Sequence, residues 1–359
     1  MNLPNHGANP LRLYKQAGII PPERWQDFSE NVQPFGPPAF IKEEWNDFFP
    51  LLSSYPDPEA EPFRTAAADF HGLAKEQVAA GNGAAEIFTW LARRYCGKLV
   101  ALVEPAFSEY RQTLEAENAS IKEIQLDAEN GWRLETVGME SALEGCAALY
   151  ICNPHNPTGL LIDVDMLKKI AEICQEANCE LVIDEAFIDF VSEDASFVPY
   201  LEQFPHVFIV RSMTKMYAIA GLRLGYVLGS SSNISELTKG SAHWNVNALS
   251  AVIGARCFNE QEYRHSIICS AAEERQKMQM FLTEWNCLFT ESAANFLSFR
   301  LPADKNPHLF FQDMLKAGKV LRHTYSFKGM GGEWFRIGVK SSDAMEELRE
   351  AIAKWLQDN

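Results

Sequence analysis

The sequence is short of basic residues and has no long apolar run. Lysine and arginine total 32 against 48 acidic residues, so the net charge is −16, and the pI is near 5.0. This deficit disfavours binding to nucleic acid or to an anionic membrane, and it makes any anion site a local cluster of a few arginines. No apolar stretch approaches a membrane span, and the N-terminus lacks the charged-then-apolar pattern of a signal peptide. We therefore expect no nucleic-acid partner and no membrane location.

Cysteine is present but follows no ligand or disulfide pattern. The 8 cysteines include no Cys-x-x-Cys pair. Cys174 and Cys179 are the closest useful couple, and their expected places on a helix and at a strand start favour packed thiols over metal ligands. This usage predicts a reduced, cytoplasmic compartment and no metal site. Low-complexity segments and internal repeats are also absent.

The central part of the chain has the pattern of a parallel α/β sheet. With 359 residues, 47% of them hydrophobic, the chain can form a substantial core and about two domains. Short continuous apolar runs are typical of strands buried on both faces of a sheet, and here they alternate with amphipathic helices such as Val164–Ala177. The expected strands are Leu99–Val103, Ala147–Cys152, Leu181–Asp184, Val207–Val210 and Leu224–Leu228.

The two ends of the chain are organised differently. Residues 1–45 are rich in Pro, Asn and Gly and predict an N-terminal arm with a short helix near Pro22–Phe28, packed with a small domain. We expect a large domain over residues 46–240, a connecting helical segment over 241–285 and a small α+β domain over 286–359. The small domain is predicted from strands at Ala294–Arg300, Val320–Arg322 and Trp334–Val339, and from helices at about Pro307–Ala317 and Ser342–Leu356.

Three residues follow buried strands at a spacing that would bring them together. Lys215 comes after Val207–Val210, Asp184 ends an earlier strand, and Asn156 lies after another. A lysine at the mouth of a buried strand loses its proton at low cost and can form a Schiff base with an aldehyde. The three predict a pyridoxal phosphate (PLP) site, with Lys215 as the catalytic anchor, Asp184 paired with the pyridine nitrogen and Asn156 donating to the phenolic oxygen.

The remaining parts of such a site also have candidates. The phosphate needs backbone N–H groups at a helix start, and the turn around residues 81–86 opens into a helix expected over Ile87–Arg94. A serine hydroxyl and an arginine would complete the phosphate site, and Phe107 is placed to stack on the ring. The candidate phosphate ligands are Gly83, Ala84, Ala85, Ser212 and Arg223.

Each candidate also has an ordinary alternative. Lys215 taken alone suits a solvated surface, Asp184 a helix N-cap and Asn156 an Asn-Pro turn. Phe107 suits a core position. Residues 212–215 also match the Ser-x-x-Lys motif of serine β-lactamases and penicillin-binding proteins, but the companion Ser-Asp-Asn and Lys-Thr-Gly elements are absent. The combination favours the PLP site.

The combined motif resembles the fold-type I aminotransferase superfamily over nearly the whole chain. It consists of Asn156, Asp184, Ser212, Lys215 and Arg223. Within that superfamily, His6-Gly7-Ala8-Asn9 and residues 29–37, 184–190 and 244–248 are similar to stretches of the threonine-phosphate decarboxylase family of the cobalamin pathway. Histidinol-phosphate aminotransferases are near relatives.

The resemblance implies a fold and a reaction. The fold is a three-layer α/β/α large domain with a mostly parallel sheet, plus a smaller α+β domain. The reaction is PLP-dependent decarboxylation of L-threonine O-3-phosphate to (R)-1-amino-2-propanol O-2-phosphate through an external aldimine. Histidinol-phosphate transamination is the alternative. An aminotransferase-like transcription regulator would need an added basic DNA-binding module, and we expect the fold to start almost at residue 1.

The resemblance also implies substrate contacts and a partner. Tyr55 matches a tyrosine that reaches the cofactor phosphate of the neighbouring subunit, which implies a homodimer with shared active sites. Arg336 matches an arginine that grips the substrate carboxylate, while Arg322 would suit the substrate phosphate; which arginine takes which anion stays open, and either could instead form a surface ion pair. The expected substrate residues are His6, Asn9, Asn156, Arg322 and Arg336.

Phe187 departs from the aminotransferases, which usually carry tyrosine at this position. Phenylalanine cannot donate to the phenolic oxygen, so we expect the imine at Lys215 to hold its proton more tightly. Together with the His6–Asn9 arm, this departure favours decarboxylation. Two further departures affect the expected substrate preference: Ala8 replaces a glycine, and Lys340 stands where arginine is common.

Overall fold

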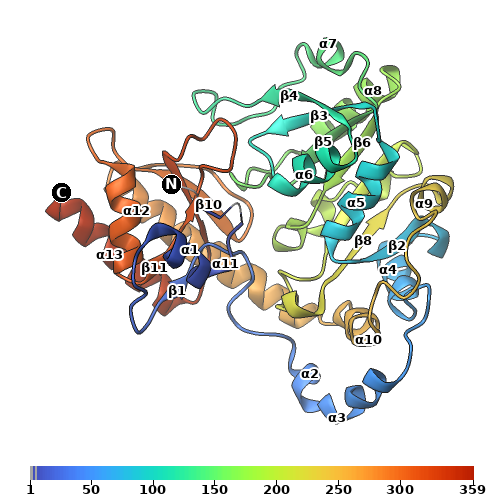
Figure 1. Cartoon of the computed structure of the whole chain (residues 1–359), viewed down its shortest axis with the longest axis horizontal. Coiled ribbons are helices and arrows are strands. Elements are labelled where there is room, and N and C mark those ends of the chain that lie inside the picture. The colour runs from blue at the N-terminus through green and yellow to red at the C-terminus, as the bar shows by residue number, and fades with distance from the viewer. Residues whose placement is uncertain (1–2, 5) are drawn as a thin grey trace.

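The computed structural model describes residues 3–4 and 6–359, in which the two larger sheets and their helices lie on opposite sides of the molecule (Figure 1). The larger sheet has seven strands in the order β2-β8-β7-β6-β5-β3-β4. Neighbours from β4 to β7 are parallel, whereas β8 runs antiparallel to both β7 and β2. The strands are β2 (Val78–Asn82), β3 (Leu99–Glu104), β4 (Ser120–Gln125), β5 (Ala148–Cys152), β6 (Glu180–Asp184), β7 (Val207–Ser212) and β8 (Leu224–Leu228).

Both faces of this sheet are buried, which explains the continuous apolar runs. Alternate residues of β5 point to different cores: Leu149 and Ile151 to one, Tyr150 to the other. The expected three-layer α/β/α arrangement around a mostly parallel sheet is confirmed, and all five expected strands are present. The associated helices are α4 (Phe63–His71), α5 (Ala84–Arg94), α6 (Ser108–Ala116), α7 (Met139–Leu143), α8 (Val164–Glu176), α9 (Ser231–Leu237), α10 (Ala248–Cys257) and α11 (Gln261–Glu284).

The second sheet has four antiparallel strands in the order β12-β13-β10-β9. Its core is shared with the N-terminal arm, because Leu13, Tyr14 and Phe28 pack among its residues. A separate two-stranded pairing joins the arm to this part of the chain. The elements are α1 (Pro10–Ala17), β1 (Gln26–Asp27), β9 (Leu288–Phe289), β10 (Phe296–Arg300), α12 (Pro307–Lys316), β11 (Lys319–Val320), β12 (Arg322–His323), β13 (Trp334–Gly338) and α13 (Ser342–Asp358).

The predicted short helix near Pro22–Phe28 is wrong. That segment is extended and forms β1, which pairs in parallel with β11. The helix of the arm is α1 instead. It begins where the Asn9 side chain accepts from the Arg12 N–H, with proline at the first turn, and it ends at Gly18 in the left-handed conformation (φ 67°). These are the usual start and stop signals of a helix.

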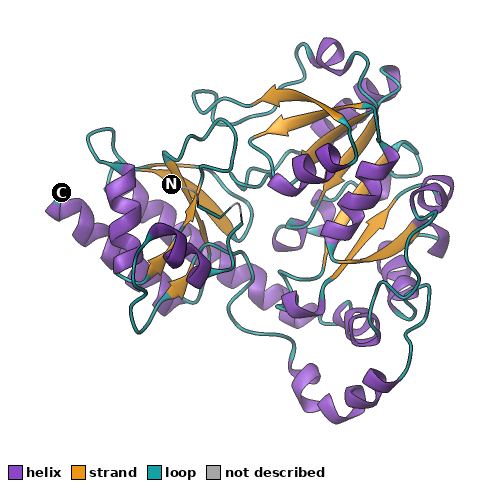
Figure 2. Cartoon of the chain, viewed as in Figure 1, coloured by secondary structure: helices purple, strands orange, loops and turns teal. Residues whose placement is uncertain are grey.

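One segment extends away from the body of the molecule (Figure 1). It contains α2 (Ala39–Glu43), α3 (Trp45–Phe48) and a 3₁₀ turn over Phe49–Ser53. Helices and loops separate this segment from both sheets in the view of Figure 2. Across the described residues, no helix is long and apolar enough to cross a bilayer. Other 3₁₀ turns lie at Lys75–Gln77, Ile188–Phe190, Glu193–Ala195, Val198–Tyr200 and Ala220–Leu222.

Candidate active site

The carboxyl ends of β5, β6 and β7 share one edge of the large sheet. Cys152, the last residue of β5, is the register partner of Asp184, which in turn pairs with Val210 of β7. Asn156 follows β5 closely and Lys215 follows β7 closely. Side chains that follow neighbouring parallel strands meet at this edge, where α/β proteins bind their ligands.

Lys215 is held by a hydroxyl at the end of its own strand. Its Nζ donates to Ser212 Oγ at 2.9 Å, and Ser212 Oγ also lies 2.9 Å from Thr214 Oγ1. Burial lowers the pKa of Lys215, the nearby Asp184 opposes that shift, and Arg223 lowers the pKa further. A lysine with a lowered pKa offers a neutral amine more readily, as a Schiff-base nucleophile requires.

Asp184 is 5% exposed and is bonded through both carboxylate oxygens. Oδ1 accepts from the Ala186 N–H at 3.0 Å, and Oδ2 accepts a short hydrogen bond from the Tyr110 hydroxyl. Burial raises the pKa of Asp184, while Tyr110 and then Lys215 lower it. Tyr110 was not predicted. A signal was available, since it lies one helical turn after Phe107.

Asn156 links the sheet edge to the second sheet. Its Oδ1 accepts from Arg336 Nη1 at 2.6 Å, and Arg336 Nη2 donates to the Ser29 carbonyl at 2.8 Å. Because Oδ1 is occupied by the arginine, the Asn156 amide keeps its N–H donors for another acceptor. Such a donor suits a phenolic oxygen.

The turn between β2 and α5 forms a cradle of backbone N–H groups that lies directly against the Arg223 guanidinium. Gly83 has φ 74°, and a Cβ built on it would lie 2.4 Å from Arg223 Nη2. A Cβ on Gly225 would lie 2.6 Å from the Ala84 nitrogen. The first N–H groups of a helix lack intrahelical partners, and no side chain caps α5. Exposed N–H groups beside a guanidinium make an anion site of the kind that a phosphate needs.

Arg322 and Arg336 face each other as register partners on β12 and β13. They are 3% and 6% exposed. The ring of Phe327 has its centroid 5.0 Å from the Arg322 guanidinium carbon and 6.0 Å from that of Arg336. Burial lowers the pKa of Arg322 to about 9, with a further contribution from Arg336, and burial lowers the pKa of Arg336 to about 10. Two buried like charges favour an anionic ligand between or beside them.

The N-terminal arm contacts the first turn of α6. His6 Nε2 lies 3.2 Å from Glu109 Oε1, and the hydrogen bond from His6 lowers the pKa of Glu109. The His6 and Phe107 ring centroids are 5.9 Å apart, so His6 lies beside the expected ring-stacking residue. The Asn9 side chain caps α1, and its role at the substrate stays a prediction.

Tyr55 lies apart from these residues. It is 84% exposed, and its ring lies 5.3 Å from that of Trp244. Within the described part of this single chain, no contact joins Tyr55 to Lys215, Asp184 or the phosphate cradle. Its expected role at the site of a neighbouring subunit stays a prediction.

The sequence is similar to known proteins over nearly its whole length. The family described as "Aminotransferase class I and II" matches residues 23–353. The threonine-phosphate decarboxylase of Salmonella typhimurium is 30% identical over 350 residues, which are 97% of this chain and 95% of that protein. A histidinol-phosphate aminotransferase of Rhodopirellula baltica is 29% identical over 97% of this chain and 94% of its own.

A solved structure shares the fold. It is the histidinol-phosphate aminotransferase from Sinorhizobium meliloti in complex with pyridoxal-5'-phosphate, with a TM-score of 0.85 and 20% identity. The similarity covers 98% of this chain and 95% of that one. A likeness over nearly the whole chain shows that the two proteins share a fold.

Proposed function

Because this chain belongs to the class I and II aminotransferase family and uses pyridoxal phosphate as its cofactor, we propose that it is a threonine-phosphate decarboxylase. The reaction would convert L-threonine O-3-phosphate to (R)-1-amino-2-propanol O-2-phosphate and CO₂ in cobalamin biosynthesis. The observation that carries the proposal is the buried pair of facing arginines, Arg322 and Arg336. Two fixed cations suit a small substrate that carries a phosphate and a carboxylate in one molecule.

The residues at the sheet edge suit the cofactor. Lys215 would bind the aldehyde carbon, Asp184 the ring nitrogen, and the free amide donors of Asn156 the phenolic oxygen. Phe107 would stack on the ring. The phosphate would be held by the backbone of Gly83, Ala84 and Ala85 with Ser212 and Arg223. When bound, PLP supplies an electron sink for the pair left behind when a bond at the substrate α-carbon breaks.

The protein itself supplies charge, orientation and a proton. Asp184 can stay ionised at its buried position because Tyr110, Ala186 and Lys215 stabilise its charge, and a carboxylate there favours a protonated ring nitrogen. Arg336, bonded to Asn156, and Arg322 would fix the two anionic groups and so decide which bond at the α-carbon is oriented to break. Lys215, with its lowered pKa, is placed to exchange a proton at that carbon.

The active form is proposed to be a homodimer with shared sites. Tyr55 extends from the segment that leaves the body of the chain, together with Phe49 (62% exposed) and Leu52 (61%). Large exposed apolar side chains gathered on one segment are typical of a protein interface. All 8 cysteines are free thiols, which supports the expected cytoplasmic location.

One pair of assays tests the reaction. A decarboxylase releases CO₂ from threonine phosphate without any keto acid, whereas an aminotransferase consumes histidinol phosphate only when a keto acid is present. We expect the first result, and Lys215→Ala should abolish it. Turnover of histidinol phosphate that depends on a keto acid and releases no CO₂ would instead assign the chain an aminotransferase activity. Histidinol-phosphate transamination is the second candidate function because a relative with that name is 29% identical.

A further inference from the structure

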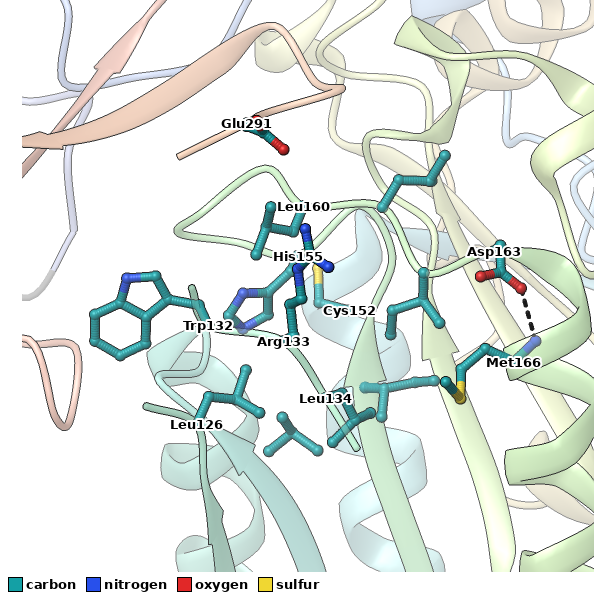
Figure 3. Close-up of a pocket in the computed structure, with 14 residues that line it drawn as sticks. Leu126, Trp132, Arg133, Leu134, Cys152, His155, Leu160, Asp163, Met166 and Glu291 are labelled. Carbon is teal, nitrogen blue, oxygen red and sulfur yellow. Dashed lines mark hydrogen bonds between the residues drawn. The ribbon is translucent and has the colours of Figure 1, made fainter. Parts of the chain in front are cut away.

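A cavity of about 360 Å³ lies against the loop that carries Asn156, where His155 and Leu160 line it (Figure 3). It is formed at the carboxyl ends of β3 and β5, between the loop that follows β4 and the loop that follows β5. Lys215, Asp184 and Arg223 do not line it. Its walls are mostly apolar, and they include Val103, Leu126, Leu134, Ile151, Leu160 and Met166. Apolar walls and a volume of roughly 300 Å³ or more are typical of a small-molecule pocket.

Two exposed side chains of opposite charge stand at the mouth of this cavity. Arg133 lies on the loop after β4, and Glu291 lies on the turn between β9 and β10. In Figure 3 the Arg133 guanidinium and the Glu291 carboxylate point toward each other past Leu160. Among the described residues, neither of these side chains takes part in an ion pair or hydrogen bond. The third charged lining residue, Asp163, is already engaged, because its Oδ1 accepts from the Met166 N–H at 2.8 Å.

We propose that this cavity binds a free α-amino acid with an apolar side chain, such as phenylalanine or leucine. The carboxylate of the ligand would pair with Arg133, its ammonium with Glu291, and its side chain would fill the apolar interior. The substrate considered above carries a single methyl group, which is too small to cover these apolar walls. The proposal does not depend on which reaction the neighbouring site catalyses.

The cavity has a direct connection to that site through His155. His155 lines the cavity and is bonded through both ring nitrogens: Nε2 lies 2.8 Å from the Pro105 carbonyl, and Nδ1 lies 2.7 Å from Thr158 Oγ1. It therefore ties the loop that leads to Phe107 to the loop that carries Asn156. A ligand that contacts His155 would restrain both loops. Binding of that ligand in the cavity should therefore change KM for the substrate more than kcat.

Calorimetric titration of the PLP-loaded enzyme tests the proposal. L-phenylalanine is the probe, and the matched probes are 3-phenylpropionate, which lacks the ammonium, and phenethylamine, which lacks the carboxylate. We expect L-phenylalanine to bind about tenfold or more tightly than either, the ratio that one lost ion contact costs in a partly desolvated site. The visible absorbance of the cofactor should not change on binding.

Variants locate the bound amino acid. Arg133→Gln and Glu291→Gln should each weaken binding about tenfold, and Met166→Trp should abolish it by filling the cavity. Arg300→Gln is the matched control, because Arg300 is a partly exposed arginine of the same region that pairs with Glu333. This variant should bind L-phenylalanine as the wild type does. Melting temperatures show that each variant is folded.

Three results would overturn the proposal. The first is absence of binding at millimolar L-phenylalanine. The second is wild-type affinity in Arg133→Gln, Glu291→Gln and Met166→Trp. The third is a shift of the cofactor absorbance together with displacement of L-phenylalanine by threonine phosphate, since these would place the amino acid in the substrate site.

Discussion

Burial and hydrogen bonding shift the pKa of Asp184 in opposite directions. Burial raises the pKa of this carboxyl group, and a carboxylic acid could not pair with a protonated ring nitrogen. The Tyr110 hydroxyl, the Ala186 N–H and the charge of Lys215 lower the pKa again. The same burial lowers the pKa of Lys215, and Asp184 counteracts it. Each group therefore reduces the pKa shift that burial causes in the other. Tyr110 is the uncharged side chain that favours the ionised form of Asp184.

Tyr110→Phe should weaken cofactor binding. Loss of a hydrogen bond to a buried charge costs about 1.5–3 kcal/mol, which corresponds to roughly tenfold to a hundredfold in the PLP dissociation constant. The acid limb of the pH–rate profile should also move to higher pH, because Asp184 must be ionised and its raised pKa would rise further. Absorbance titration with PLP and a pH–rate profile measure the two effects.

Tyr150→Phe is the control for that experiment. The Tyr150 hydroxyl is buried without a hydrogen-bond partner, and its ring lies 5.7 Å from that of Tyr110. Removal of this hydroxyl should leave PLP affinity unchanged. If both variants bind PLP as the wild type does, Tyr110 has no part in holding the Asp184 charge.

Phe187→Tyr should lower the pH midpoint of the cofactor absorbance change. The Phe187 ring centroid lies 5.4 Å from Lys215 Nζ, and the ring packs against Phe296. A hydroxyl at this position would donate to the phenolic oxygen of the cofactor and make the linkage at Lys215 less basic. A spectral pH titration of both proteins measures the midpoint, and an unchanged midpoint would contradict the role given to Phe187.

The facing arginines predict stabilisation by phosphate. Inorganic phosphate should raise the Tm of the PLP-loaded enzyme, because an anion bound only to the folded state shifts the unfolding equilibrium. Arg322→Gln should lose most of that shift, whereas Arg300→Gln, at an exposed pair with Glu333, should keep it. An equal phosphate response in the two variants would rule out Arg322 as the anion ligand.

At the scale of elements, the turn between β2 and α5 depends on a glycine. Gly83 combines a positive φ with close approach to Arg223, so an added methyl group meets both backbone strain and a steric clash. With φ 74° and ψ 165°, Gly83 has a backbone conformation that is essentially restricted to glycine, and a side chain there costs about 1–3 kcal/mol. The clash, by contrast, would displace the guanidinium that completes the phosphate cradle.

Gly83→Ala should therefore reduce PLP affinity by about tenfold or more, since the phosphate loses an aligned charge-assisted contact. Gly97→Ala is the matched control: Gly97 has φ 70°, but a Cβ there meets nothing within 4 Å. Gly83→Ala should lower Tm at least as much as Gly97→Ala, because it adds a clash to the backbone strain, and only Gly83→Ala should weaken PLP binding. Comparable PLP affinity in the two would contradict the cradle.

The two strands of the large sheet that the sequence patterns did not predict, β2 and β4, share a physical cause. β2 is built from small residues and β4 is a mostly exposed edge strand, so neither presents a continuous apolar run. α1 was overlooked although its capping residues, Asn9 and Gly18, are visible in the sequence. The strands buried on both faces were found because their environment requires apolar residues at every position.

At the scale of the whole molecule, the loop that follows β5 and carries Asn156 is hydrogen-bonded to the part of the chain that forms the second sheet. Thr290 Oγ1 donates to the Thr158 carbonyl at 2.6 Å, and Ser298 Oγ donates to the Pro157 carbonyl at 2.8 Å. The Ala293 N–H donates to the Gly159 carbonyl at 2.8 Å. The candidate cofactor residues and the paired arginines are therefore positioned relative to each other by direct bonds between the two parts of the chain.

Mixed oligomers test the proposed shared sites. Tyr55→Ala and Lys215→Ala should each have greatly reduced activity. The first variant loses the side chain that contacts the cofactor of the partner subunit, and the second loses the lysine that binds the cofactor aldehyde. When the two variants are co-refolded or co-expressed, mixed dimers should contain one site with both residues intact, and part of the activity should return. No gain on mixing, with a dimer present by light scattering, would show that each site is complete within one chain.

Residue patterns alone are sufficient to predict the buried strands of the large sheet and to nominate the candidate cofactor residues. Buried parallel strands require continuous apolar runs, and the chemistry of PLP requires a lysine, a carboxylate and an amide after them. The contacts around those residues, by contrast, arise from the packing of distant segments. The Tyr110 bond to Asp184, the Arg336 bond to Asn156 and the facing of Arg322 and Arg336 join segments up to 180 residues apart. Such contacts depend on how helices and sheets pack, which no local pattern records.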